Sequence, residues 1–255
     1  MPLDLVTIPC LKDNYAFLIH DMATGATAVV DVPDAAPILA ELKSRNWTLT
    51  DIFITHHHDD HIAGVQSLRD ATGARVWGAQ ADAHRLPALD HAVTEGDHVT
   101  VGQETGHVLD VSGHTLGHIA FHFPASGLVF TADSLMAAGC GRLFEGSPEI
   151  MWSSLSKLAA LPPDTLVCSG HEYTASNIRF ALTLEPRNPA LISRSRQVNV
   201  AREEDRPTVP STLSEELATN PFLRAALPQM KLALGMAQAT DAQAFAEIRR
   251  RKDKF

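Results

Sequence analysis

The stretch that decides the fold is Ile52-Phe53-Ile54-Thr55-His56-His57-His58-Asp59-Asp60-His61. Its apolar start predicts a buried strand, and the strand stops at a cluster of histidines and aspartates. Imidazole and carboxylate groups are ligands for zinc, iron and manganese. His56 and His58 are two residues apart, so an extended chain can point both side chains the same way. A solvated polar loop is the alternative, but so dense a cluster directly after a buried strand favours a metal-binding loop.

Strand and helix signals alternate on both sides of this loop. Before it, the pattern predicts strands over 3–8, 16–20 and 27–30 and an amphipathic helix over 34–45. After it come a helix over 62–71 and a strand over 75–78. Consecutive strands follow over 98–101, 106–111, 118–123 and 127–131, then a helix over 148–161 and a strand over 166–168. Mixed strands with helices on their outer faces predict a layered α/β sandwich.

The chain changes character after His171. No strand is expected there, and helices are predicted over 173–184, 190–203, 211–219 and 241–254. Links that contain proline and asparagine separate these helices. We therefore predict two domains, a catalytic domain over residues 1–172 and a helical domain over residues 173–255.

Composition excludes several classes of protein. With 255 residues, 45% of them hydrophobic, the chain can bury a sizeable core. The net charge of −9 disfavours general nucleic-acid binding, which depends on neutralising phosphates. Three scattered cysteines imply no disulfide framework. No secretory signal and no apolar run long enough to span a bilayer is visible. We expect a cytoplasmic monomer that binds neither nucleic acid nor membrane.

Three further candidate ligands stand at the ends of predicted strands. They are His114, Asp133 and His171, each beside small residues that let the backbone approach a crowded site. Taken singly, each would more often be a turn or loop residue. Together with the first cluster they make a set of seven candidate ligands, namely His56, His58, Asp60, His61, His114, Asp133 and His171. His57 lies between two ligands, so we expect it to point away and make a structural hydrogen bond.

Seven ligands are too many for one tetrahedral zinc ion. Two ions that share Asp133 as a bridge account for all of them. One ion would be held by His56, His58 and His114, and the other by Asp60, His61 and His171. Such a site lowers the pKa of bridging water to about 7, which supplies a hydroxide nucleophile. We expect two divalent ions, zinc first and iron or manganese as alternatives, with Asp60 and Asp133 as the catalytic carboxylates.

The loop also carries a recognisable signature. Residues 55–61 match T-H-x-H-x-D-H, and the chain resembles the metallo-β-lactamase superfamily. A closer resemblance, over essentially the whole chain, is to the glyoxalase II (hydroxyacylglutathione hydrolase) family. Its motifs lie at 139–146, at 170–174 with Asn177 and Phe180, at 206–213 with 220–222, and at 249–255. The resemblance implies a four-layer αβ/βα sandwich with a helical substrate-binding domain. The implied reaction is hydrolysis of the thioester S-D-lactoylglutathione to D-lactate and glutathione.

The substrate of that family is a net anion, so an acidic chain needs a local basic pocket to bind it. Arg249 and Lys252 are three apart on the last predicted helix and share a face. On their own they would be assigned to a solvated helix end whose charges compensate the dipole. The resemblance instead implies that they bind glutathione, with Arg142 as a second anion clamp and Tyr173 as a hydrogen-bonding partner. Phe144 stands where some family members carry tyrosine, so a hydrogen bond from that position is absent or replaced.

Other functions fit the sequence less well. A persulfide dioxygenase with a single iron would not need the second ligand group and typically lacks the long helical tail. An RNA-processing nuclease is disfavoured by the charge of −9. A binding protein with a decayed metal site is disfavoured by the complete ligand set, and a secreted β-lactamase by the missing export signal. A metal-dependent hydrolase acting on another thioester stays an alternative.

Overall fold

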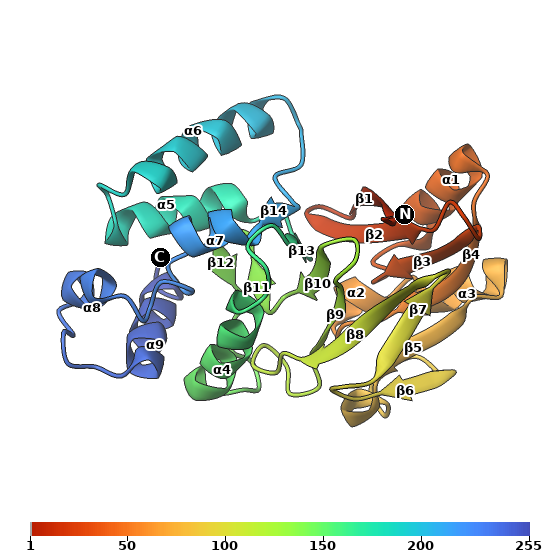
Figure 1. Cartoon of the computed structure of the whole chain (residues 1–255), viewed down its shortest axis with the longest axis horizontal. Helices are drawn as coiled ribbons and strands as arrows, with labels where there is room; N and C mark the ends of the chain where they lie inside the picture. The colour runs from red at the N-terminus through yellow and green to blue at the C-terminus, as the bar shows by residue number, and fades with distance from the viewer. Residues whose placement is uncertain (1) are drawn as a thin grey trace. The chain divides into compact units, whose positions relative to one another are not determined.

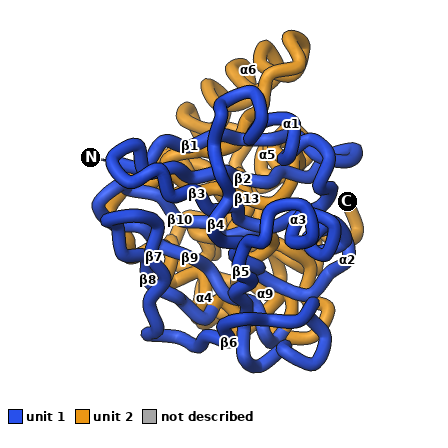
Figure 2. The backbone as a smooth tube through the Cα atoms, turned by 90° about the vertical axis from the view of Figure 1, so that its right-hand side faces the viewer, with its two compact units in different colours: residues 1–110, 116–132 blue, residues 111–115, 133–255 orange. Residues whose placement is uncertain are grey.

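The computed structural model describes residues 2–255. The chain forms two compact units, which Figure 2 distinguishes by colour. Unit 1 comprises residues 1–110 and 116–132, and unit 2 comprises residues 111–115 and 133–255. Within the described residues, no helix is long and apolar enough to cross a bilayer.

The first sheet of unit 1 has six strands in the order β1-β2-β3-β4-β5-β6 (Figure 1). Their bounds are β1 Asp4–Cys10, β2 Asn14–His20, β3 Ala26–Val30, β4 Thr48–Phe53, β5 Arg75–Ala79 and β6 His91–Val93. β1 to β3 pair antiparallel, and β3 to β6 pair parallel. Parallel neighbours need crossover connections. Helices α1 (Ala35–Arg45) and α3 (Val65–Thr72) supply two of them, and their apolar faces join one buried core cluster with β2 to β5.

Four antiparallel strands form the second sheet of unit 1, in the order β10-β9-β8-β7. They are β7 His98–Val101, β8 Glu104–Asp110, β9 Ile119–Phe123 and β10 Leu128–Ala132. The two sheets of unit 1 meet through buried aromatic side chains. The Phe53 and Phe121 ring centroids lie 5.1 Å apart, and those of Phe17 and Phe130 lie 5.7 Å apart. Strand β4 therefore packs against helices α1 and α3 on one face and against the second sheet on the other, which fixes the point where the histidine loop begins.

Unit 2 contains the remaining short strands and most of the helices. Its strands are β11 Leu135–Met136, β12 Gly139–Cys140, β13 Leu166–Ser169 and β14 Ser211–Thr212. Its helices are α4 Pro148–Ala159, α5 Thr174–Leu184, α6 Pro189–Glu203, α7 Leu213–Thr219, α8 Pro228–Leu234 and α9 Asp241–Lys252. The predicted cap of α4 is confirmed, since Ser147 accepts a hydrogen bond from the Ile150 amide and Pro148 begins the helix.

A buried polar network holds the helices of unit 2 to its β11–β12 hairpin. The Asn220 side chain donates to the Met136 and Gly139 carbonyls at 3.1 and 2.9 Å. The Glu216 carboxylate accepts from the Ala138 amide at 2.8 Å and is paired with the buried Arg194 guanidinium. Removing one partner of a buried charged pair typically costs about 3–5 kcal/mol, so a substitution of Arg194 or Glu216 alone is expected to destabilise unit 2.

Some local predictions were wrong. A strand, β14, follows His171, where only helices were expected, and helix α7 begins after it at Leu213. β14 is two residues long and pairs with β13, so its partner defines it and it leaves no periodic signal. The helix expected over 62–71 is present as α3, which begins three residues later at Val65, whereas the separate short helix α2 (Asp59–Ile62), the short strand β6 and helix α8 were missed. Gly64 separates α2 from α3, and an added Cβ there would lie 2.7 Å from the Ala35 amide nitrogen.

Candidate metal centre

Unit 1 positions its four candidate ligands directly after strand β4. His56 and His58 lie on the loop, and Asp60 and His61 lie on α2, the short helix that follows it. His56 and His61 are buried, with ring centroids 4.2 Å apart. The centroids of His56 and His58 lie 4.8 Å apart. The loop thus gathers its imidazoles, as the spacing predicted.

A buried carboxylate, Asp31, orients two of these histidines. It follows β3, and its Oδ2 accepts from His61 Nδ1 at 2.9 Å and from the Thr55 hydroxyl at 2.8 Å. Because that hydroxyl donates to Asp31, its oxygen accepts from His56 Nδ1 at 3.0 Å. Both rings therefore carry their proton on Nδ1, and Nε2 is left as the ligand atom.

Asp31 and Asn14 were missed by the sequence analysis. The Asn14 side chain donates to the carboxylate and to the carbonyl of Asp60, both at 3.0 Å. For Asp31 a signal was present, because an acidic residue stands directly after a buried apolar strand. Asn14 gives no comparable signal, since it lies 46 residues from the carboxylate it orients.

Unit 2 brings together His114, Asp133 and His171, all three buried. Asp133 Oδ2 lies 3.5 Å from His114 Nε2 and 3.4 Å from His171 Nε2. His114 Nδ1 donates to the Arg142 carbonyl at 2.8 Å, so Nε2 is again the ligand atom. The chain can fold this tightly only with glycine at 141, where an added Cβ would lie 2.0 Å from the Asp133 carbonyl oxygen.

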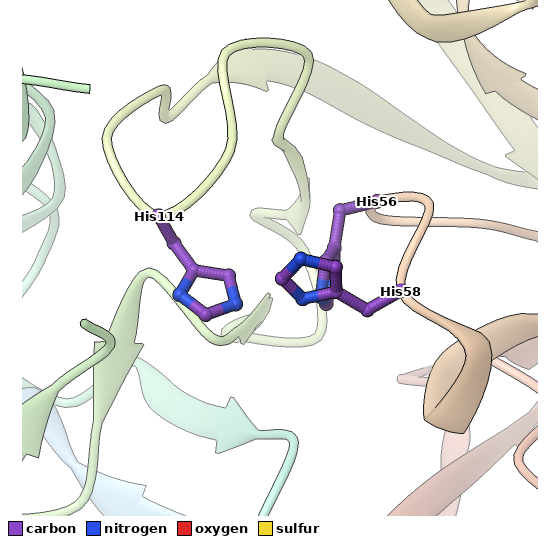
Figure 3. Close-up of side chains that lie close together, drawn as sticks. All are labelled: His56, His58 and His114. Atoms are coloured by element: carbon purple, nitrogen blue, oxygen red, sulfur yellow. The ribbon is translucent and has the colours of Figure 1, made fainter. Parts of the chain in front are cut away.

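Three groups of side chains each have their ligand atoms within 4.8 Å of one another: Asp31 with His56 and His61, and two groups that consist of candidate ligands alone. One consists of His56, His58 and His114, whose rings Figure 3 shows converging, and the other of Asp60, His61 and His171. The sequence analysis divided the ligands between two ions in the same way, and that division stays a prediction. Neutral imidazoles with the second ring nitrogen already hydrogen-bonded, together with carboxylates, are a donor set that fits divalent zinc or iron.

The other two histidines near this loop have structural contacts. His57 Nδ1 lies 2.9 Å from Asp82 Oδ2, which confirms the expected structural hydrogen bond. Asp82 is itself buried and ion-paired with Arg85. His118 stacks on His56, with ring centroids 4.6 Å apart and planes 11° apart, and its Nδ1 donates to the Ile119 carbonyl. These contacts help to hold His56 in place.

Replacing Asp31 by alanine is expected to weaken metal binding by about 10–100-fold, because two ligand rings lose the acceptor that orients them. The measurement is competition against a chelator, followed by metal analysis. Asp51→Asn is a matched control, since Asp51 is equally buried in the same sheet but bonds Arg75 and Trp77. A folded Asp31→Ala protein with unchanged metal affinity would contradict the orienting role.

The candidate substrate-binding residues lie in unit 2, and Arg249 differs from expectation. Its guanidinium is buried, donates to the Cys140 carbonyl at 3.0 Å and pairs with Asp253 at 2.7 Å. Lys252 is half-buried, and its Nζ donates to the Ser176 carbonyl at 3.3 Å. The two share a face of α9 as predicted, but Arg249 also has a structural role.

Positive charge gathers around Lys252. Burial, together with the charges of Arg249, Arg179 and Arg142, lowers the pKa of Lys252 from 10.5 to about 8. Arg179 was not singled out from the sequence. Arg179 lies inside the predicted helix 173–184, and nothing in the sequence indicates that its charge acts on Lys252 of the last helix.

Two aromatic side chains stack on ligand histidines. The Tyr173 ring lies parallel to that of His171, with centroids 4.7 Å apart and planes 5° apart. Phe144 is exposed, and its ring centroid lies 5.2 Å from that of His114. Both predicted substrate-binding aromatics therefore contact ligand rings.

Two family models match the chain, one up to residue 171 and the other after it. A family model described as metallo-beta-lactamase superfamily matches residues 14–171. A second model, described as hydroxyacylglutathione hydrolase C-terminus, matches residues 172–255. Among solved structures, ETHE1 from Myxococcus xanthus is 26% identical with a TM-score of 0.67 and covers 98% of this chain and 90% of its own. The BLEG-1 B3 metallo-beta-lactamase, 22% identical, has a TM-score of 0.67 and covers 86% and 99%. The predicted fold class is confirmed.

Curated relatives agree over the full length. Hydroxyacylglutathione hydrolases from Cereibacter sphaeroides and Fuscovulum blasticum are 68% and 66% identical, each over 100% of both chains. The relative of that name from Ruegeria pomeroyi is 63% identical over the same extent. These identities favour neither the dioxygenase nor the nuclease alternative. The chain belongs to the hydroxyacylglutathione hydrolase family of the metallo-β-lactamase superfamily.

Proposed function

We propose that this chain hydrolyses S-D-lactoylglutathione to D-lactate and glutathione at a centre of two divalent metal ions. Membership of its family makes it a thioester hydrolase. The two-ion centre is inferred from two groups of ligands. One group is His56, His58 and His114, and the other is Asp60, His61 and His171. Zinc is the expected metal, with iron or manganese as alternatives.

Two ions held by these groups would lower the pKa of bound water to about 7 and polarise the thioester carbonyl. The protein's own contribution is orientation. Asp31 and the Arg142 carbonyl hold the ligand rings with Nε2 exposed to the site. Asn14 orients the Asp60 carboxylate, and Asp133 contributes a negative charge within 3.5 Å of His114 and His171.

The basic cluster of unit 2 would bind the glutathione part of the substrate. We assign this role to Lys252, Arg142 and Arg249, with Tyr173 and Phe144 beside the ligand histidines. Support comes from the family match at residues 172–255, which agrees with the proposed division into a catalytic domain (1–172) and a glutathione-binding domain (173–255). A cytoplasmic, monomeric state is part of the same proposal.

The test is an assay of glutathione release from S-D-lactoylglutathione, run beside metal analysis of the same preparation. We expect rapid release and a metal content approaching two ions per chain. Treatment with a chelator should abolish release, and added zinc should restore it. Metal-replete protein that releases no glutathione would overturn the assignment, and full activity at one ion per chain would overturn the two-ion centre.

Lys252 makes substrate binding sensitive to pH. Its folded-state pKa is lowered to about 8, so it loses its charge as the pH rises through that value. Because the charged form attracts the anionic substrate, we expect kcat/KM to fall above about pH 8, mainly through KM. Because its pKa is lowered on folding, charged Lys252 destabilises the folded state below about pH 8. This cost is relieved as the pH rises from about 8 to 10.5, where the unfolded chain binds more protons.

Two variants separate this effect from others. Lys252→Ala should raise KM by roughly tenfold at pH 7, the equivalent of about 1.4 kcal/mol, and should lack the fall above pH 8. Lys252→Arg keeps a positive charge at every accessible pH, so its profile should stay flat through that range. A third variant, Arg249→Ala, should lower thermal stability, because it removes the buried contacts with Cys140 and Asp253. A fall above pH 8 that persists in Lys252→Arg would contradict this assignment.

A further inference from the structure

Three histidines form a row across the second sheet of unit 1 and share no residue with the candidate metal centre. His98 on β7 is the register partner of His107 on β8, and His107 is the partner of His122 on β9. Side chains of directly paired residues lie on the same face of a sheet. The three imidazoles therefore stand side by side on one face, and we call them the histidine row.

The row lies on the face opposite the aromatic core. Its neighbours along the strands, such as Val108 and Phe121, are fully buried, and Phe121 packs on Phe53 of the other sheet. Side chains alternate between faces, so His107 and His122 point away from that core. His98 is exposed, His107 is half-buried and His122 is 9% exposed. The row thus runs from the surface inward.

Its geometry is close to that of a metal site. Two imidazoles bound to one tetrahedral ion with bonds of about 2.0–2.1 Å place their ring centroids about 5 Å apart. The centroids of His98 and His107 lie 4.9 Å apart, and those of His107 and His122 lie 6.3 Å apart. The distance between His107 and His122 is about 1 Å too long. Rotation of the half-buried His107 side chain toward His122 would shorten it, and the exposed His98 side chain can rotate in the same direction.

The inner end of the row offers a ligand atom. His122 Nε2 is buried and has no hydrogen-bond partner among residues 2–255. A buried polar atom without a partner costs free energy, and binding a cation would remove that cost. Burial and the neighbouring His107 lower the pKa of His122, so its ring is neutral, the form that binds metals.

The surroundings carry negative charge. A cavity of about 450 Å³ is lined by His98, His107, Asp21 and Glu104, among others. Asp21 accepts hydrogen bonds from the Ala23 and Gln103 amides, which lower its pKa, and Glu104 accepts from the Ser126 amide. These carboxylates are occupied by the hydrogen bonds, so they act as fixed negative charges and not as ligands.

We propose that His98, His107 and His122 form a second metal site, which takes one ion of the class that prefers imidazole, such as Zn²⁺, Ni²⁺ or Cu²⁺. Water completes its coordination from the cavity. Hard cations such as Mg²⁺ prefer oxygen ligands and do not bind there. An ion in this position joins three neighbouring strands, so it stabilises unit 1 and leaves the hydrolytic centre unchanged.

The test uses the zinc-loaded enzyme and counts bound Zn²⁺ by equilibrium dialysis and metal analysis. The wild-type protein should bind one ion per chain more than His107→Ala does. Without the central ligand, an ion would keep only His98 and His122, which stand on strands about 9.6 Å apart with no ligand between them, so affinity should fall on the order of a hundredfold. His98→Ala keeps the inner pair and should lose about tenfold. His84→Ala, which removes an exposed histidine outside the row, should bind as wild type does.

A second readout is thermal stability. Because an ion that binds only the folded state raises the melting temperature, added Zn²⁺ should raise Tm in the wild type and in His84→Ala, and Mg²⁺ should not. His107→Ala should lose this shift and keep its rate of thioester hydrolysis, which also shows that the variant is folded. Equal Zn²⁺ binding by wild type and His107→Ala, or an equal loss in His84→Ala, would overturn the proposal.

Discussion

Asp133→Ala is expected to lower the rate of thioester hydrolysis by on the order of a thousandfold or more and to reduce metal content together with it. Asp133 Oδ2 lies 3.5 Å from the ligand atom of His114 and 3.4 Å from that of His171. These two histidines belong to different ligand groups, so the same carboxylate lies close to a ligand atom of each group. A loss of several kcal/mol of charge stabilisation, about 4 kcal/mol, corresponds to about a thousandfold in rate.

The measurement is kcat at saturating substrate beside metal analysis of the same sample. Asp133→Asn is the matched variant, because it keeps the shape of the side chain and removes its charge. We expect it to bind metal more weakly as well, and circular dichroism should show both variants folded. An Asp133→Ala protein that keeps two ions and its full rate would show that the ions are not bridged by this residue.

The second large effect concerns the leaving group, and we expect thioesters to be cleaved at least about a thousandfold faster than the equivalent amide. The leaving thiol of glutathione has a pKa of about 8.5–9, close to that of free cysteine, so it departs as a thiolate without prior protonation. An amine leaving group is far more basic and needs a proton donor, a contribution typically worth about 10²–10⁴-fold.

The measurement compares S-D-lactoylglutathione with an analogue in which an NH group replaces the sulfur. Competitive inhibition by the amide would show that it occupies the site, so that its slow cleavage reports on chemistry and not on binding. Amide cleavage within tenfold of the thioester rate would reveal a proton donor. His57 would then be the first candidate, because its ring is held 2.9 Å from the buried Asp82 carboxylate.

Much of the centre could be predicted because its chemistry is local in the chain. The spacing of His56, His58, Asp60 and His61 places four ligands on one loop and one short helix, whatever the rest of the molecule does. Asp133 and His171 could be found because strand ends followed by small residues leave a recognisable pattern. The assignment of these ligands to two ions stays a prediction, which the Asp133 variants test.

Sequence by itself determined the ligand types, the buried strand before them, the cap at Ser147 and the family. Tertiary structure alone decided which partners orient those ligands, because hydrogen bonds such as Asp31 to His61 join residues 30 positions apart. It also decided that Arg249 donates to the Cys140 carbonyl, 109 positions away in the chain, and that His98, His107 and His122 stand in one row. The reason is physical: periodicity tells which face a side chain occupies, whereas strand register and helix packing decide what it meets there.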